Sequence, residues 1–175
     1  MPILDPAARH EAAACDLVLQ VLESFGEARL TAQGASMIPA LWPGDMLLVH
    51  RMDAGRVSPG DIVLCRRVGG LRAHRLLAKL QTASGTVLVT RGDALSEDDP
   101  PQPAAGMLGR VSAVVRGQAQ RPLSRRLSFG QTMVALLARR SAWATRILVR
   151  AHSVPAAVRA GRGFCSQEAL CPPSR

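Results

Sequence analysis

The sequence predicts a small, mainly β, antiparallel domain with a helix on either side of it. Between residues 28 and 115, short β-like runs alternate with turns rich in Gly and Pro at intervals of about eight to twelve residues, which is typical of antiparallel all-β structure. Before and after this region, apolar residues recur every three or four positions, as in amphipathic helices. With 175 residues, 47% of them hydrophobic, the chain is long enough for one compact domain and an appendage.

These patterns divide the chain into four segments. Residues 1–27 are expected to form a helix, over 6–25, that packs on the domain through apolar residues at positions 14, 17, 18, 21, 22 and 25. The domain spans 28–121, with expected strands at 46–49, 62–64, 71–77, 86–90 and 108–115. Residues 122–154 are expected to be a basic amphipathic appendage, helical over 124–150, and residues 155–175 a flexible tail.

Two of the turns carry the same tripeptide, Pro-Gly-Asp, directly before an expected strand. Glycine adopts the positive φ of a tight turn without steric cost. The aspartates of the two tripeptides, Asp45 and Asp61, are therefore predicted to be structural.

The chain is strongly basic, with a net charge of +9 and a pI near 11.2. Such a charge suits anionic partners, either nucleic acid or a membrane surface. Aromatic residues make up only 3% of the chain and Tyr is absent, so nucleic acid, which is often bound by stacking, is not an expected partner. For residues 124–150 two interpretations stay open: a surface helix with its arginines in water, and peripheral contact with an anionic membrane.

No apolar stretch is long enough to span a bilayer, and the first residues lack the basic start and apolar core of a secretory signal peptide. A cytoplasmic location is therefore expected. Cys15 and Cys65 are predicted to be small core residues. Cys165 and Cys171 lack the spacing of zinc or redox motifs, and a disulfide between them would need an oxidising compartment. No metal and no cofactor are expected.

The turn at residues 34–41, GASMIPAL, contains a candidate nucleophile, Ser36. A serine hydroxyl needs a neighbouring base to take its proton. His74 is a candidate base because it lies in a β-like run in the middle of the domain, although a lone histidine in a strand is more often structural than catalytic. Lys79, the only lysine, is expected to face away from Ser36 unless a bulge intervenes, since residues an odd number apart on a straight strand point to opposite sides. The remaining histidines are predicted to lie at the surface: His10, His50 and His152.

An acidic run, TRGDALSEDDPP at residues 90–101, directly follows an expected strand. Such a run is usually a solvated turn or a helix cap, and it lacks the alternating oxygen ligands of a calcium loop. A carboxylate beside an imidazole would instead hold its tautomer and stabilise the imidazolium. The candidates for this role are Asp93, Asp98 and Asp99.

Taken together, these motifs resemble the type I signal peptidases and, more broadly, the superfamily that includes the self-cleaving SOS repressors of the LexA kind. The serine box of the family is matched by GASMIPAL followed by PGD, and a second box by RVSPGDIV at residues 56–63. The base box reads His74-Arg75, as in the endoplasmic-reticulum and archaeal type, where bacterial enzymes usually have Lys-Arg. The acidic box is matched by TRGDALSEDD, with Ala-Leu where the reticulum type has Asn-Asn.

The resemblance covers about residues 30–115 and implies a signal-peptidase/LexA-like catalytic domain. It implies Ser36 as nucleophile, His74 as general base, Asp98 or Asp99 as the orienting acid and Asp93 as a structural residue. It also implies an acyl-enzyme mechanism with cleavage after small side chains of a substrate bound as an extended strand. The oxyanion would be bound by backbone N–H groups, because Gly34 stands where some relatives have a serine. The serine box is completed by Met37 and Pro39.

The expected function is that of a serine endopeptidase that processes a precursor peptide or protein. The sequence shows neither the membrane anchor of typical signal peptidases nor the DNA-binding helix pair and scissile linker of the SOS repressors. Two other classes stay open: a degenerate module that only binds peptides, and a basic accessory protein of nucleic acid or membranes.

Overall fold

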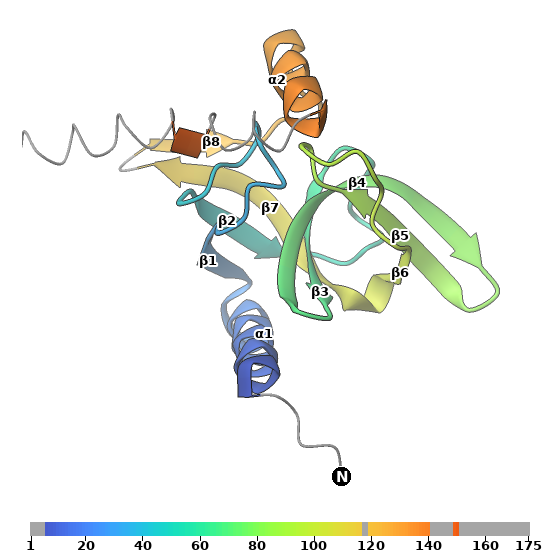
Figure 1. Ribbon diagram of the computed structural model, residues 1–175. Coiled ribbons are helices and arrows are strands. Elements are labelled where there is room, and N and C mark those ends of the chain that lie inside the picture. The colour runs from blue at the N-terminus through green and yellow to red at the C-terminus, as the bar shows by residue number, and fades with distance from the viewer. Residues whose placement is uncertain (1–5, 117–118, 141–148, 151–175) are drawn as a thin grey trace, which may run out of the picture.

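The structure, a computed structural model, describes residues 6–116, 119–140 and 149–150. It is mainly β, as predicted: eight antiparallel strands form one sheet, accompanied by two α-helices (Figure 1). None of the helices in the described part of the chain combines the length and the apolar character that crossing a bilayer requires. The predictions for residues 155–175, for Cys165 and Cys171 and for His152 lie outside the described residues.

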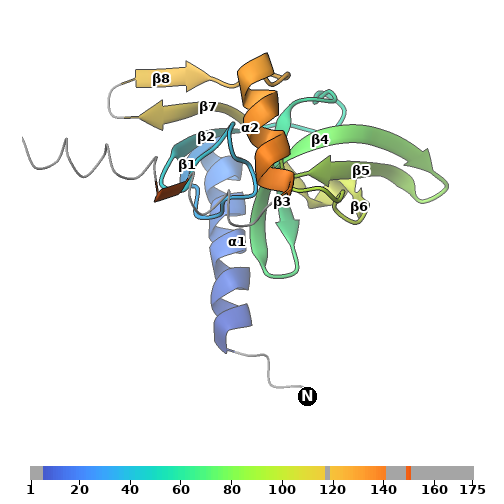
Figure 2. The same cartoon turned by 45° about the horizontal axis from the view of Figure 1, so that its top comes forward.

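The sheet has the strand order β1-β2-β7-β3-β4-β5-β6, and β8 pairs with the second half of β7. Strand β7 is central because it pairs with β2 along one edge and with β3 and β8 along the other. The hairpin of β4 and β5 extends beyond the body of the molecule (Figures 1 and 2). The strands are β1 (Glu27–Thr31), β2 (Met46–Arg51), β3 (Ile62–Arg67), β4 (Gly70–Thr82), β5 (Gly85–Arg91), β6 (Gln102–Pro103), β7 (Met107–Arg116) and β8 (Ala119–Pro122).

All five predicted strands are present, and three further strands were missed. The missed strands are β1, β6 and β8, which are five, two and four residues long. Strand β8 is exposed along its whole length, so it has no alternation of apolar and polar residues to reveal it. Strand β6 ends in a proline, which is typical of an edge strand and weakens any β pattern in the sequence.

Helix α1 (Pro6–Phe25) has the predicted bounds, and Gly26 ends it with a φ of 73°. The C-terminal end of the helix lies against the sheet, as Figure 1 shows, and contacts β1, β2, β4 and β7. Its buried residues are Cys15 and Leu22, whereas Leu17 and Phe25 are 61% and 77% exposed. The prediction that Ala14, Leu17 and Phe25 belong to the buried face is therefore wrong. The face that packs on the core is lined by Cys15, Val18, Leu19 and Leu22, whereas Leu17 lies on the opposite side of the helix and Ala14 and Phe25 lie at the edge of that face.

Two hydrophobic clusters form the main core. One lies under α1 and is built from β1, β2 and β7 together with the serine turn. The other fills the curve of β3, β4 and β5 and includes Cys65. The burial of Cys15 and Cys65 as small core residues is thus confirmed. Because the serine turn contributes Met37 and Leu41 to the first cluster, the turn is anchored in the core rather than lying loosely on the surface.

Both Pro-Gly-Asp turns have the predicted structural role. Gly44 and Gly60 have φ values of 89° and 95°. The carboxylate of Asp45 accepts a hydrogen bond from the Trp42 N–H at 2.8 Å, and that of Asp61 accepts one from the Ser58 N–H at 2.9 Å. Each aspartate is also paired with an arginine from far along the chain: Arg116 binds Asp45, and Arg125 binds Asp61.

The predicted helix over 124–150 is wrong in its first turn. Helix α2 (Phe129–Arg140) begins five residues after Ser124, and residues 141–148 lie outside the described residues. The start is set by a capping box, in which the Gln131 N–H donates to the Ser128 hydroxyl at 3.4 Å and the Ser128 N–H donates to the Gln131 side chain at 2.9 Å. Residues upstream of Ser128 are irregular because Arg75 binds the carbonyl groups of Ser124 and Arg125.

Candidate active site

Ser36 and His74 lie next to each other in the folded chain. The Ser36 hydroxyl is 3.0 Å from Nε2 of His74, although 38 residues separate the two. Ser36 is half-buried, and His74, in the middle of β4, is only 2% exposed. The distance is that of a hydrogen bond from a hydroxyl to an imidazole nitrogen, so proton transfer between the two groups needs no rearrangement.

Asp99 completes a line of three side chains. Its Oδ2 lies 2.6 Å from Nδ1 of His74 and also accepts a hydrogen bond of 2.6 Å from the Thr90 hydroxyl. An ionised carboxylate only accepts hydrogen bonds, so Nδ1 carries the proton and Nε2 is left free to accept one from Ser36. Asp99 thereby holds His74 in the tautomer that a general base needs.

Several groups keep Asp99 ionised. Burial of the carboxyl opposes its ionisation, but hydrogen bonds from Thr90 and His74, with the charges of His74 and Arg67, outweigh that effect and hold the pKa of Asp99 below its ordinary value. Arg67 lies 3.9 Å from the carboxylate and donates a hydrogen bond of 2.9 Å to the Pro100 carbonyl. The negative charge beside the imidazole therefore persists through the range in which histidines titrate.

The other candidate residues lie elsewhere. Asp98 is exposed and pairs with Arg91 at 3.2 Å, so of the two neighbouring acids only Asp99 contacts His74. The Lys79 ammonium donates to three carbonyl groups of residues 54–57 and does not contact Ser36. The pairing of β4 with β5 does shift register between Leu76 and Ala78, which is the bulge that the prediction named as an exception, but Lys79 still lies outside the site. His50 is 3.8 Å from Glu27 at the surface.

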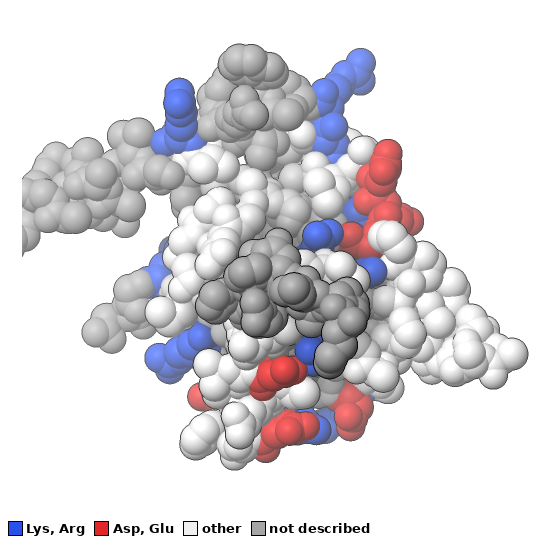
Figure 3. All heavy atoms as spheres, turned by 60° about the horizontal axis from the view of Figure 1, so that its bottom comes forward, with Lys and Arg blue, Asp and Glu red and all other residues white. Residues whose placement is uncertain are grey.

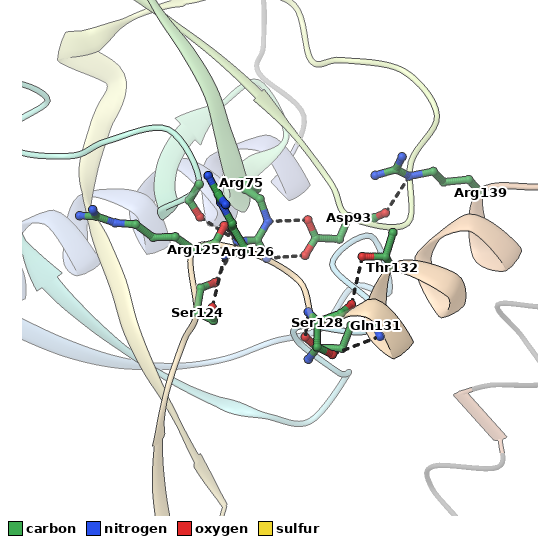
Figure 4. Close-up of polar contacts among 10 residues, drawn as sticks. Arg75, Asp93, Ser124, Arg125, Arg126, Ser128, Gln131, Thr132 and Arg139 are labelled. Atoms are coloured by element: carbon green, nitrogen blue, oxygen red, sulfur yellow. Dashed lines mark hydrogen bonds and ion pairs between the residues drawn. The ribbon is translucent and has the colours of Figure 1, made fainter.

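Asp93 lies in the acidic loop but points away from His74. Its carboxylate binds the guanidinium of Arg75 through two hydrogen bonds of 2.7 Å each (Figure 4). Arg75 also donates to the carbonyl of Gly60 at 2.7 Å, and the Asp93 carbonyl accepts a hydrogen bond of 3.0 Å from Arg139 of α2. The Arg75–Asp93 pair thus joins the acidic loop to β4, to the second Pro-Gly-Asp turn and to α2, in agreement with the structural role expected for Asp93.

The acidic loop also contacts the backbone of Ser36. The Ala94 N–H donates to the Ser36 carbonyl at 2.8 Å. A Cβ atom on Gly92 would lie 2.6 Å from the same carbonyl, so only glycine fits there. Within the serine turn, Met37 and Pro39 are buried, while Gly34 is exposed with open space around it. The acidic loop therefore packs directly against the Ser36 carbonyl, and the burial of Met37 and Pro39 fixes the turn beside it.

Sequence reasoning missed the supporting roles of four residues. Thr90 and Gly92 lie inside the acidic box. A hydroxyl residue close to the candidate acids and a glycine directly after a strand were sequence signals from which their roles could have been predicted. Arg67 and Arg139 carried no such signal, because each reaches its partner from a distant segment of the chain.

A serine, an imidazole and a carboxylate in this order form the arrangement used for nucleophilic attack on acyl groups. In the described part of the chain, no three His, Cys, Asp or Glu side chains converge as metal ligands would. Neither a protein-family model nor a curated protein matches this chain.

Proposed function

We propose that this chain is a serine endopeptidase in which Ser36, His74 and Asp99 form the catalytic triad. The observation that carries the proposal is the continuous path from the Ser36 hydroxyl through both nitrogens of His74 to the Asp99 carboxylate, with distances of 3.0 and 2.6 Å. A buried histidine with a hydrogen bond on each ring nitrogen could also be purely structural, but a structural histidine has no need of a half-buried serine in a turn as its second partner.

In the acylation step, the Ser36 oxygen attacks the carbonyl carbon of the scissile peptide bond while Nε2 of His74 takes the hydroxyl proton. The tetrahedral intermediate collapses as the C–N bond breaks, and the imidazolium gives its proton to the leaving amine. Backbone N–H groups of the serine turn bind the oxyanion, since Gly34 offers no side-chain donor. Asp99 stays ionised and stabilises the imidazolium throughout.

Deacylation repeats these steps with water. Nε2 of His74 takes a proton from the water as its oxygen attacks the ester, and Ser36 recovers its proton when the new carboxylic acid leaves. The similarity of the four boxes to those of type I signal peptidases extends the proposal to the substrate, an extended segment of a precursor with small side chains before the cleaved bond.

Covalent labelling tests the proposal without knowledge of the natural substrate. The purified full chain is incubated at pH 8 with a fluorophosphonate and, separately, with a penem, and intact mass is recorded over time. We expect one adduct per chain, on Ser36, with loss of labelling in both Ser36→Ala and His74→Ala. Ser84→Ala is the matched control, because Ser84 is an exposed serine in the β4–β5 turn, and it should label like the wild type.

Labelling by neither reagent, or equal labelling of Ser36→Ala, would contradict the proposal and favour a module that only binds peptides. Ala-x-Ala peptides added to the same samples then test the proposed preference for small side chains.

A further inference from the structure

Helix α2 buries small residues and exposes large ones. The residues packed against the body of the molecule are Ala135 and Ala138, which are 1% and 5% exposed. The opposite face carries large apolar side chains at the i, i+4, i+7 and i+8 positions, with exposed fractions from 41% to 82%: Phe129, Met133, Leu136 and Leu137. A helix that only covers a core shows the reverse arrangement, so this exposed apolar stripe needs another explanation.

The exposed stripe is accompanied by unpaired positive charge. Arg126 precedes the helix and Arg140 ends it, and neither forms an ion pair with any residue that the structure describes. Other arginines of this region are already bound inside the molecule, such as Arg125 to Asp61 and Arg139 to the Asp93 carbonyl. The sequence contains no Asp or Glu between Asp99 and Glu168, so nothing in α2 or its flanks offsets this charge.

We propose that α2 is a membrane-docking helix that lies in the surface of an anionic bilayer. The four apolar side chains of the stripe enter the boundary between headgroups and acyl chains, and Arg126 and Arg140 contact lipid phosphates. Apolar residues along one face with arginines at both ends are the combination that interfacial helices present to anionic lipid. Charge complementarity therefore favours a bilayer over a second copy of this chain, which would bring like charges together.

The buried face of α2 contacts the serine turn and the acidic loop, so docking would bring both of them close to the bilayer. Ala138 packs in one cluster with Ile38, two residues after Ser36, and with Ala94 of the acidic loop. Arg139 holds the same loop through the Asp93 carbonyl, as Figure 4 shows. A bilayer bound to the outer face of α2 would therefore lie one helix diameter, about 10 Å, from the serine turn. Docking does not depend on the proposed peptidase activity, but it would bring that site to substrates at the membrane surface.

Vesicle sedimentation of the full chain tests the docking helix. The probes are vesicles of phosphatidylcholine alone and of phosphatidylcholine with about one-third phosphatidylglycerol, at about 50 mM and about 500 mM salt, where screening differs strongly. We expect binding only to the anionic vesicles and loss of most of it at high salt. The double variant Phe129→Gln/Leu137→Gln should bind at least tenfold more weakly, and Arg126→Gln/Arg140→Gln should lose the salt dependence along with affinity.

Matched controls separate docking from unfolding and from catalysis. Val68→Gln removes an apolar residue that is fully exposed in the β3–β4 turn and should bind like the wild type. Ser36→Ala should bind fully even though it is expected to be inactive, so failure of the peptidase proposal leaves this test intact. Circular dichroism checks that the double variants keep the fold, as their exposed positions lead us to expect.

Three results would overturn the proposal. The first is absence of binding by the wild type. The second is full binding by Phe129→Gln/Leu137→Gln, which would assign the membrane affinity to other residues. The third is a dimer, measured by light scattering, that the same double variant converts to monomer while vesicle binding is unchanged, which would make the stripe an interface between copies of the chain.

Discussion

Asp98 and Asp99 are neighbours in the chain but differ in what they contact. Only Asp99 reaches the imidazole, whereas Asp98 pairs with Arg91 at the surface. Asp99→Asn keeps the shape of the side chain but removes the charge, and its amide would favour the wrong tautomer of His74. If the proposed triad acts, we expect the rate of Ser36 acylation to fall by about 10⁴-fold, as the same change does in a Ser-His-Asp peptidase.

Asp98→Asn is the matched control for this prediction, and it should stay within about twofold of the wild type because exposed ion pairs contribute little. Acylation rates from intact-mass time courses measure both variants. Similar losses in the two variants would show that the charge of the loop, rather than the contact with His74, is what matters.

The identity of the base is read from the pH dependence of acylation. Imidazole loses its basic form on protonation near neutral pH, whereas a lysine base would need a pH of about 8 or above even if burial lowered its pKa. Because the pKa of Asp99 is held below its ordinary value, that carboxylate stays ionised over the whole range and adds no limb of its own. We therefore expect a single acid limb below neutrality in a plot of acylation rate against pH.

Lys79→Arg should show the same profile, because the lysine only binds carbonyl groups of residues 54–57. A limb clearly above pH 8, or loss of labelling in Lys79→Arg with the fold intact, would move the role of base from His74 to Lys79.

At the scale of elements, the acidic loop supports the serine turn through a glycine. A methyl group on Gly92 would meet the Ser36 carbonyl at 2.6 Å and the Leu95 side chain at 3.0 Å, so Gly92→Ala has to displace the turn or the loop. A shift of about 1 Å at a nucleophile costs about 10²-fold in rate, and we expect a loss of that order in Ser36 acylation. Gly130→Ala is the control, since nothing lies within 4 Å of its position in α2. Unchanged acylation in Gly92→Ala would mean that the loop gives way instead.

The same elements show what sequence patterns can and cannot predict. Strand β3 was predictable because four consecutive buried residues leave an apolar run in the sequence. The bounds of α1 were predictable because its apolar residues recur with helical spacing and Gly26 ends it. The start of α2 was misplaced because the basic residues before it resemble a continuation of the helix, although Ser128 and Gln131 marked the true start. The sequence could not predict which of Asp98 and Asp99 contacts His74, because this depends on how the loop after β5 turns back so that the Asp99 N–H binds the Thr90 carbonyl.

At the scale of the whole molecule, much of the positive charge has a structural use. Arginines bind the buried carboxylates of both Pro-Gly-Asp turns and of the acidic loop. They join β7 to the first turn, the segment before α2 to the second turn, and β4 to the acidic loop. On the face seen in Figure 3, positive and negative side chains are interspersed, and the outer part of the hairpin of β4 and β5, residues 80–90, forms an extension without charged side chains. The net charge of +9 is therefore a poor guide to partners unless the arginines that are already bound are set aside.

Because these arginines bind ionised carboxylates, we expect the protein to lose stability at acid pH, and Asp61 is the residue with which to test this expectation. Burial opposes ionisation of Asp61, but hydrogen bonds from Arg125 and the Ser58 N–H, with the charges of Arg125 and Arg110, hold its pKa below the ordinary value of 3.8. A carboxyl whose pKa is lowered by folding stabilises the fold above its unfolded pKa, and that contribution disappears as the pH falls through the folded pKa. Asp61→Asn should therefore lower Tm at pH 7, and the difference from the wild type should shrink steadily below about pH 4.

Asp53→Asn, at an exposed position, is the control and should follow the wild-type curve of Tm against pH at every value. Parallel curves for the wild type and Asp61→Asn down to about pH 2 would show that shape and hydrogen bonding, rather than charge, join this turn to the segment that leads into α2.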